Sequence, residues 1–378
     1  MIYTLTHFDT PLIEFSAENK AEAGVKIIKI HDENRELFPL DLAEVSAEAV
    51  ESWIKHRSIP KNRAYVDTLL SSMGLSINRP FDIIRVSSGL SLNDCYWLKS
   101  ESNNNDFDRV NLYDNSFNRV LGQIAFTGYG SGNASRLTSS PEFTTNGILP
   151  KCWRREKGKI LLYKGGTQGA SNTGNEPYSE FYAYQIAKIL GVDAIPYSIS
   201  KWKGILCSTC ELFTSKDVSF VPVGRIVRSG GMKAVRDYYK KLGAEFEKAL
   251  NDMIIFDALI FNTDRHYGNF GFLIDSHTNK IIAPAPLFDH GNSLFNLVGT
   301  DALKSKESFW KYAKTQLPCV YDDFVSEAKK VLTHDNRNAV RKLLNFKLPK
   351  HSRYNLDKGR VKLIEYAVSK RAAELLEE

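Results

Sequence analysis

The stretch Asn262-Thr263-Asp264-Arg265-His266-Tyr267-Gly268-Asn269 is followed, after an apolar segment, by Phe288-Asp289-His290-Gly291. It places a carboxylate at Asp264, an amide five positions later at Asn269, and a second carboxylate twenty positions further at Asp289. Phosphoryl transfer from ATP needs one carboxylate to orient the attacking hydroxyl, and further oxygen ligands to hold Mg²⁺ on the phosphates. The pattern therefore predicts a phosphotransferase in which Asp264 is the catalytic base and Asn269 and Asp289 bind Mg²⁺.

The spacing from Asp264 to Asn269 is also that of the catalytic loop of protein kinases, whose magnesium-binding Asp follows a short hairpin later. Two histidines lie in the same stretches. His266 is expected to be structural. His290 beside Asp289 raises the alternative of an Asp/His metal phosphoesterase, but the sequence lacks the further His and Asp ligands of a dinuclear site.

A lysine that could reach ATP phosphates ends the apolar strand expected at 160–163. This is Lys164, which precedes two glycines. A strong helix is expected over 176–190, with Pro177 in its first turn and Gly191 after its end. Glu180 faces inward if the apolar side of this helix packs on the sheet, so we expect Glu180 to pair with Lys164. Glu176 is the alternative partner, although its place at the helix start suits a cap.

The loop Thr138–Lys151 is the candidate phosphate loop, although it carries one glycine, Gly147, and no Walker motif. We expect Gly147 and Lys151 to contact the nucleotide. The loop hydroxyls could donate to phosphate or receive it, and an ordinary Ser/Thr linker is the equally weighted alternative: Ser139, Ser140, Thr144 and Thr145. Backbone groups around Glu211 and Phe213 are expected to contact adenine.

The order of expected elements predicts an α+β, bilobal, protein-kinase-like fold with an additional N-terminal α+β module. We expect residues 1–125 to form this module, 126–213 a small β-rich lobe and 214–378 a large helical lobe. The elements expected before residue 126 are helices over 45–59 and 64–73 and strands over 81–86 and 95–99. Beyond it we expect a β-hairpin over 148–163, strands over 194–202 and 205–213, and a hairpin over 270–284.

The composition restricts the class of protein. The net charge of +6 and the pI near 8.8 are mildly basic, and without a long Lys/Arg run we expect no direct nucleic-acid binding. The first ten residues lack the features of a signal peptide, and no apolar run is long enough to span a membrane. Five cysteines form no even disulfide framework, and Cys207 and Cys210 lack the second pair of a zinc site. We expect a cytosolic protein, with secretion independent of a signal peptide as the alternative.

Together these residues resemble the HipA-like family of serine/threonine kinases, whose fold is related to that of phosphatidylinositol 3/4-kinases. The resemblance covers about residues 138–345 and is most specific at 262–269 and 288–293. The short stand-alone subgroup similar to CtkA resembles the chain more than the toxin members do. The resemblance implies ATP and Mg²⁺ as cofactors, Asp264 as the catalytic Asp, and autophosphorylation three positions before the loop glycine, at Thr144. Residues 1–125 do not show the small N-terminal subdomain pattern of the toxin members, so their antitoxin and substrate are not carried over.

The predicted function is transfer of the γ-phosphoryl group of ATP to Ser/Thr hydroxyls of a protein whose identity the sequence does not give. One alternative is a small-molecule or lipid phosphotransferase on the same scaffold, which a deep, open acceptor cleft would favour. The other is a nucleotide-binding partner protein without turnover. Lys164, Asp264, Asn269 and Asp289 are all present, which speaks against that second alternative.

Overall fold

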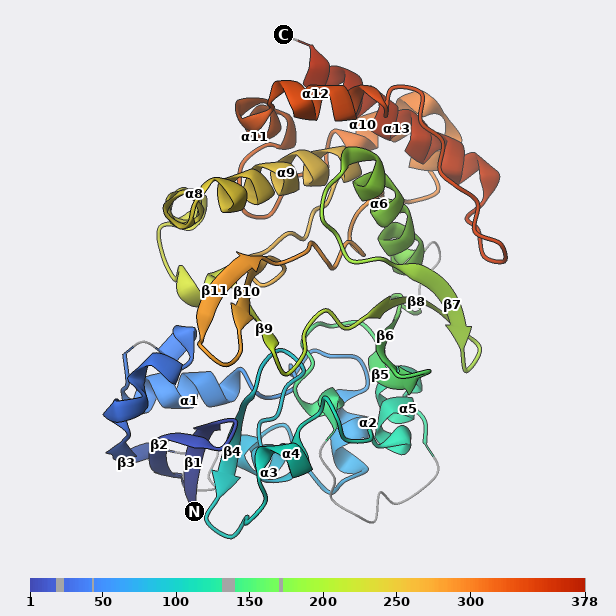
Figure 1. Ribbon diagram of the computed structural model, residues 1–378. Coiled ribbons are helices and arrows are strands. Elements are labelled where there is room, and N and C mark those ends of the chain that lie inside the picture. Colours follow the sequence, from blue (N-terminus) through green and yellow to red (C-terminus); the bar gives the residue numbers. More distant parts are fainter. Residues whose placement is uncertain (18–23, 43, 131–139, 170–172, 378) are drawn as a thin grey trace. The chain divides into compact units, whose positions relative to one another are not determined.

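The computed structural model describes residues 1–17, 24–42, 44–130, 140–169 and 173–377 (Figure 1). The chain folds into two compact units, each built from segments that are far apart in the sequence. The first unit consists of Met1–Lys164, Glu211–Val221 and Leu273–Ile282, and the second of Gly165–Cys210, Pro222–Phe272 and Ala283–Glu378. The three-part division expected from the sequence stays a prediction.

The first unit begins with an antiparallel sheet in the order β3-β2-β1-β4. Its strands are β1 (Ile2–His7), β2 (Thr10–Ala17), β3 (Val25–Ile30) and β4 (Tyr96–Ser100). Leu5 at the centre of β1 lies opposite Ile13 on one side and Leu98 on the other, and all three side chains are buried. The strand expected over 95–99 is thereby confirmed as β4.

Helices cover this sheet and form a second core beside it. They are α1 (Ala47–Lys55), α2 (Val66–Ser71), α3 (Pro80–Ser87), α4 (Phe107–Val110) and α5 (Arg119–Thr127), with the 3₁₀ helices η1 (Asp32–Leu37) and η2 (Leu40–Leu42). The helices expected over 45–59 and 64–73 are confirmed as the shorter α1 and α2. Ser46 caps α1 by accepting a hydrogen bond from the backbone N–H of Ala49 at 3.1 Å.

The strand expected over 81–86 is wrong, because these residues form the helix α3. Pro80 starts the helix, and Asp82 lies in its first turn. Phe81 and Ile84 pack in the core under the sheet, whereas Ile83 and Val86 pack in the second core. A helix buried on two sides carries a nearly continuous apolar run, and such a short run cannot be distinguished from a buried strand by its periodicity.

The remainder of the first unit carries the candidate phosphate loop. The 3₁₀ helix η3 (Pro141–Phe143) leads into the hairpin of β5 (Lys151–Glu156) and β6 (Lys159–Gly165), which confirms the hairpin expected there. Lys157 and Gly158 both have positive φ, of 50° and 80°, which fits a two-residue hairpin turn. The sheet β11-β10-β9 contains β9 (Val218–Pro222), β10 (Gly271–Asp275) and β11 (Lys280–Pro284), so the hairpin expected over 270–284 is also confirmed.

The second unit contains the helix α6 (Glu176–Leu190), whose bounds are those expected from the sequence. Gly191 ends it in the left-handed conformation with φ 70°. The antiparallel hairpin of β7 (Ser198–Trp202) and β8 (Ile205–Glu211) follows and confirms the two strands expected there. Between α6 and β7, Ala194 forms a parallel bridge with Leu287, which fixes the segment just before Asp289.

The remaining helices surround α9 (Ala244–Ile260), which is buried from Met253 to its end. Helices α6, α8, α11 and α13 contact it, and Figure 1 shows it in yellow beside the red C-terminal helices. The others are α7 (Val223–Ile226), α8 (Gly231–Leu242), η4 (Ala302–Lys304), α10 (Lys306–Ala313), α11 (Phe324–Val331), α12 (His334–Arg341) and α13 (Lys358–Leu376). Asn262 and Asp264 therefore follow directly on the most deeply buried helix of the unit. Within the described residues, no helix is both long and apolar enough to cross a membrane.

Candidate active site

A buried ion pair lies under the predicted catalytic loop. The Nε and Nη2 atoms of Arg265 donate to the two carboxylate oxygens of Asp257, at 2.9 and 3.1 Å. Asn262 Nδ2 donates to the same carboxylate at 2.9 Å. Burial is the largest single effect and lowers the pKa of Arg265, but the charge and hydrogen bonds of Asp257, together with the charge of Asp289, outweigh it and the pKa is raised. The guanidinium is therefore a permanent cation in the interior.

The same guanidinium connects the two stretches that carry the predicted metal ligands. Its Nη1 donates to the backbone oxygen of Asn269 at 3.1 Å and to that of Phe288 at 2.6 Å. Its Nη2 lies 2.9 Å from Nδ1 of the buried His290. Since a guanidinium can only donate, Nδ1 of His290 accepts, and the imidazole is neutral with its proton on Nε2. His290 is thus a structural partner of Arg265.

Asp264 is held at three points. Its backbone N–H donates to Asn262 Oδ1 at 3.1 Å, and its backbone oxygen accepts from Asn269 Nδ2 at 3.1 Å. Its carboxylate Oδ2 accepts from Asn292 Nδ2 at 2.8 Å. Asn292 is itself oriented, because its Oδ1 accepts from Asn296 Nδ2 at 3.1 Å. This network fixes the plane of the carboxylate through one oxygen.

The residues predicted to bind Mg²⁺ follow the two ends of the Arg265 bridge. The bond from Asn269 Nδ2 to Asp264 uses the amide nitrogen and directs Oδ1, the atom a hard cation prefers, away from that contact. Asp289 has φ 58°, and its backbone N–H donates to the hydroxyl of Tyr197 at 3.2 Å. An amide oxygen and a carboxylate on connected loops fit Mg²⁺, which is bound in proteins through few protein ligands with waters and phosphates.

Glu180 and Glu176 have different surroundings on α6. Glu180 is fully buried, and its Oε2 accepts from the backbone N–H of His290 at 2.8 Å. Glu176 accepts from the backbone N–H of Thr167 at 3.2 Å and from its hydroxyl. Glu176 therefore closes the loop before α6, whereas Glu180 supports the segment of Asp289 and His290. The pairing of Glu180 with Lys164 stays a prediction.

In the first unit, Lys164 and Lys151 occupy paired positions on the β5–β6 hairpin, and both are buried. Lys151 Nζ donates to the backbone oxygen of Asn146 at 2.7 Å. A Cβ on Gly147 would lie 2.1 Å from this Nζ, and Gly147 has φ 94°. The positive φ therefore favours glycine at this position, whereas the Lys151 side chain could move to make room.

The guanidinium of Arg63 binds the backbone of the candidate phosphate loop. Its Nη1 donates to the backbone oxygens of Glu142 and Thr145 at 3.1 and 3.0 Å, and its Nη2 to that of Lys151 at 2.6 Å. Burial lowers the pKa of Arg63 to about 10, so it stays protonated at neutral pH. Arg63 therefore holds the backbone of residues 142–151 at three points.

The hydroxyls of this loop point into the protein. Thr144 Oγ1 is buried and donates to the backbone oxygen of Leu90 at 2.7 Å. Thr145 Oγ1 donates to Pro141 O at 2.6 Å and accepts from Trp153 Nε1 at 3.0 Å. Ser140 is buried and donates to Glu142. Ser139 lies outside the described residues. Phosphorylation of Thr144 or Ser140 would require the loop to leave this position.

The residues predicted near adenine have ordinary contacts in the first unit. Glu211 is exposed, and its Oε2 accepts from Lys159 Nζ at 2.6 Å. The backbone N–H of Leu212 donates to Ile160 O at 2.9 Å. The ring of Phe213 packs edge-to-face against that of Phe220, with ring centroids 5.5 Å apart. A role of the backbone near Glu211 and Phe213 in adenine binding stays a prediction.

A thiol lies in the electrostatic field of Asp264. Cys319 is exposed, whereas the other four cysteines are buried. Burial of the sulfur, followed by the negative charges of Asp264 and Asp257, raises the pKa of the Cys319 thiol to about 11. Cys319 in turn contributes to the raised pKa of Tyr267, which is due first to burial.

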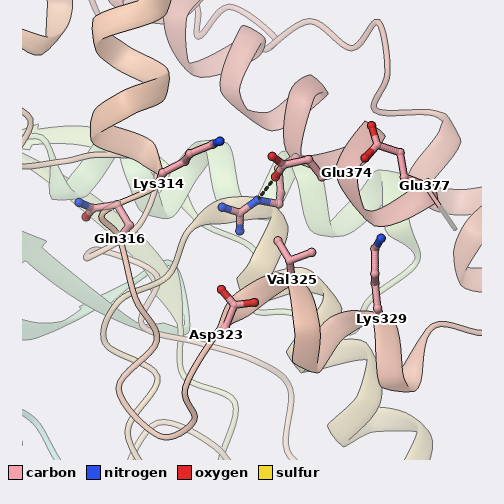
Figure 2. A pocket seen from close by; sticks show the side chains of 8 residues that line it. Lys314, Gln316, Asp323, Val325, Lys329, Glu374 and Glu377 are labelled. Carbon is pink, nitrogen blue, oxygen red and sulfur yellow. Dashed lines mark hydrogen bonds and ion pairs between the residues drawn. The ribbon is translucent and has the colours of Figure 1, made fainter.

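A pocket of about 410 Å³ lies among the C-terminal helices (Figure 2) and contains none of the predicted site residues. It is lined by Lys314, Gln316, Asp323, Val325, Lys329, Arg371, Glu374 and Glu377. Its three cations and three carboxylates balance, and Arg371 Nε already donates to Glu374 at 3.2 Å. No group of three or more His, Cys, Asp or Glu side chains that could hold a metal occurs within the described residues.

The structure brings Asp264, Asn269, Asp289 and Glu180 together in the second unit. Lys164, Lys151, Gly147 and the loop hydroxyls belong to the first. Sequence reasoning missed Arg265, Asn292 and Tyr197. Arg265 and Asn292 stand inside the quoted motifs, so their polar character next to Asp264 and His290 was the available signal. Tyr197 carried no signal, because its contact with Asp289 arises from the bridge between distant segments.

No family model matches the chain, and no curated protein matches it in sequence. HipA of Shewanella oneidensis MR-1, from a toxin–antitoxin system and solved with HipB and operator DNA, is 13% identical with a TM-score of 0.52 over 99% of this chain and 96% of its own. The Helicobacter pylori proinflammatory kinase CtkA is 15% identical with a TM-score of 0.47 over 61% of this chain and 90% of its own.

The likeness to HipA establishes the fold. The chain has the mixed helix-and-sheet, kinase-like fold expected from its sequence. The similarity in fold includes residues 1–125, which the resemblance in sequence did not reach.

We predict that Asp257→Ala lowers the free energy of unfolding by about 3–5 kcal/mol, because it leaves the Arg265 cation buried without its partner. Urea denaturation followed by circular dichroism measures the change. Asp301→Ala is the control, since Asp301 pairs with Lys304 at 2.6 Å on the surface and should leave stability nearly unchanged. Equal stability of the two variants would contradict the structural role of the Asp257–Arg265 pair.

We also predict that Cys319 reacts with iodoacetamide at pH 8 at least about tenfold more slowly than free cysteine, because a raised pKa leaves little thiolate. The rate should rise as the pH approaches about 11, where the thiol ionises. Asp264→Asn removes a nearby negative charge and should lower the pKa and accelerate alkylation. Mass spectrometry gives the rates, and Cys319→Ser is the blank. An alkylation rate unaffected by Asp264→Asn would contradict an effect of the Asp264 charge on the pKa of the Cys319 thiol.

Proposed function

We propose that the protein is an ATP- and Mg²⁺-dependent kinase that transfers the γ-phosphoryl group to Ser/Thr hydroxyls of a protein. The proposal is supported by two sets of hydrogen bonds that hold the predicted catalytic loop. Asn292 fixes one carboxylate oxygen of Asp264, while Arg265 joins the segments of Asn269 and Asp289 through one guanidinium. Positioning of this kind supplies most of the catalysis in phosphoryl transfer.

In this proposal the residues have separate tasks. Asp264 accepts the proton of the acceptor hydroxyl or orients it, and Asn269 and Asp289 hold Mg²⁺, which would neutralise charge on the phosphates. Lys164, Lys151 and the backbone at Gly147 contact the phosphates. A kinase-like fold is common to protein, lipid and small-molecule kinases, so the acceptor is decided by experiment and not by the fold.

The alternative of a small-molecule or lipid phosphotransferase uses the same residues on another acceptor. The alternative of a nucleotide-binding partner without turnover would not need Asp264 to be oriented through Asn292 and Asn296. Incubation of the purified protein with Mg²⁺ and labelled ATP, with and without protein acceptors, tests all three. Label on Ser or Thr supports the proposal, label on lipid or a metabolite supports the first alternative, and binding without ADP release supports the second.

We predict that Asp264→Ala and Asp289→Asn each reduce phosphoryl transfer about a hundredfold or more without unfolding the protein. Calorimetry should distinguish them. Asp289→Asn weakens Mg²⁺-dependent ATP binding because it removes a ligand charge, whereas Asp264→Ala largely preserves it. The reverse pattern would exchange the two roles, and near-normal turnover in either folded variant would refute this assignment of the site.

We predict autophosphorylation in the loop, first on Thr144 and otherwise on Ser139, Ser140 or Thr145. A phosphate adds nearly two negative charges where the loop should meet ATP phosphates, so it should displace the loop and weaken ATP binding. Mass spectrometry after long incubation with Mg²⁺-ATP maps the sites, and Thr144→Glu tests the effect on ATP binding, with Thr144→Val as the uncharged control. An active enzyme without loop phosphate would contradict the first part, and unchanged ATP affinity of Thr144→Glu the second.

A further inference from the structure

The pocket of about 410 Å³ among the C-terminal helices belongs entirely to the second unit, and we call it the charged pocket. Its lining comes from the end of α10 and the segment after it, from α11 with its cap, and from the last turns of α13. Of the eight described residues that line it, seven have polar or charged side chains. Small-molecule sites begin at about 300 Å³, so the charged pocket has room for a small polar ligand.

Arg371 is the buried charged group of the pocket, and its orientation is fixed. Its side chain is 5% exposed. Its Nε donates to Glu374 at 3.2 Å, its Nη1 donates to Ala258 O at 3.2 Å, and its guanidinium carbon lies 4.1 Å from the centroid of the Phe261 ring. Within the described part of the chain, Nη2 has no hydrogen-bond acceptor. A guanidinium donates through all three nitrogens, so Nη2 is left to bind an anionic group in the pocket.

The other charged side chains of the pocket do not neutralise one another. Among the described residues, the side chains of Lys329 and Glu377 form no hydrogen bond or ion pair. The Lys314 ammonium lies 5.9 Å from the ring centroid of Trp310 and has no carboxylate partner in the same part of the chain. Asp323 uses one carboxylate oxygen to cap α11. Both signs of charge are therefore available to a ligand, and Figure 2 shows these side chains around the pocket.

This mixture of charges distinguishes between two classes of small ligand. A polyanion such as inorganic phosphate would meet the three cations, but it would also face the carboxylates of Asp323, Glu374 and Glu377. A zwitterion has one group for each sign, so it can bind the cations without leaving a like charge opposite the carboxylates. The balance of three cations and three carboxylates therefore favours a zwitterion.

We propose that the charged pocket binds a small zwitterion of the class of free amino acids and dipeptides. The carboxylate of the ligand accepts from Nη2 of Arg371, beside the ammonium groups of Lys314 and Lys329. The ammonium group of the ligand meets the carboxylates of Glu377 and Asp323. The inference is independent of the proposed kinase function, in which no residue of the charged pocket takes part.

Arg371 also connects the charged pocket to the start of the catalytic loop. Its acceptor Ala258 follows Asp257 in the last part of α9. Phe261, on which its guanidinium packs, ends α9 with φ 53° and precedes Asn262. A ligand that binds the guanidinium in this orientation stabilises the state in which both contacts are made, so local opening of this turn becomes rarer.

Calorimetry on the full-length protein tests the class of ligand. The probes are the common free amino acids, glycylglycine, N-acetyl-glycylglycine, glycylglycine amide and inorganic phosphate. The acetylated form keeps only the anionic group, and the amide keeps only the cationic group. We expect at least one zwitterion to bind, and to bind at least about tenfold more tightly than its two blocked forms and than phosphate, because each blocked form loses one charged hydrogen-bonding group.

Charge reversal at the edge of the pocket tests the location. Lys314→Glu/Lys329→Glu should abolish binding of the zwitterion, whereas Lys311→Glu/Lys342→Glu, which reverses two exposed lysines outside the lining, should retain it. Arg371→Lys keeps the buried charge but lacks the planar group, so it should weaken binding as well. If Arg371→Lys does not fold, the double reversal decides, because both of its lysines lie outside the buried core.

Amide hydrogen exchange measured by mass spectrometry tests the connection to the catalytic loop. A saturating concentration of the zwitterion should slow exchange in residues 258–264 of the parent protein and of the Lys311→Glu/Lys342→Glu control, and should have no effect in Lys314→Glu/Lys329→Glu.

Each other result overturns a defined part of the proposal. If no zwitterion binds, or if a blocked form or phosphate binds as tightly, the ligand class is wrong. If binding survives Lys314→Glu/Lys329→Glu, the ligand binds elsewhere. If binding leaves exchange in 258–264 unchanged, the connection to the catalytic loop is refuted. None of these measurements uses phosphoryl transfer, so failure of the kinase function would be distinguished from failure of this proposal.

Discussion

The ion pair between Asp257 and Arg265 is the constraint on which the second unit depends. Both side chains are almost completely withdrawn from solvent, and burying two charges costs more than a single contact between them returns. The arrangement is stable because every partner is supplied by rigid structure: Asp257 lies inside the buried helix α9, and Asn262 donates to the same carboxylate. A charge pair of this kind specifies one geometry, since a shifted loop would leave a buried cation without its acceptors.

The choice of arginine follows from the number of acceptors. Its planar guanidinium reaches the Asp257 carboxylate, the backbone oxygens of Asn269 and Phe288, and His290 at the same time. A lysine at this position has three donors around one atom and could not span these directions. The two segments that carry Asn269 and Asp289 are therefore held by one rigid side chain, which bonds to the backbone oxygens of Asn269 and Phe288.

Local signals predicted much of the fold. Pro177 and Gly191 delimit α6, and the hairpins at 151–165 and 271–284 follow from turn residues between apolar runs. The prediction was wrong at α3, because a helix buried on two sides shows no clear helical period. The roles of Arg265 and Asn292 were not predicted. Their function depends on partners 8 and 28 residues away, and such separations become contacts only after α9 and the Phe288–Asn292 segment are folded. Residue type and spacing identify the candidate ligands, whereas the groups that orient them require the fold.

The charged side chains that are predicted to contact ATP and Mg²⁺ come from both units. The first holds Lys151, Lys164 and Arg63 around the candidate phosphate loop, where the Lys151 ammonium donates to the backbone oxygen of Asn146. The second collects Asp264, Asp289 and Glu180. Triphosphate with Mg²⁺ presents both signs, anionic oxygens and a cation, so each set is chemically suited to one part of the same ligand. The inward-facing Thr144 belongs with the cationic set, because its hydrogen-bond acceptor Leu90 lies in the same unit.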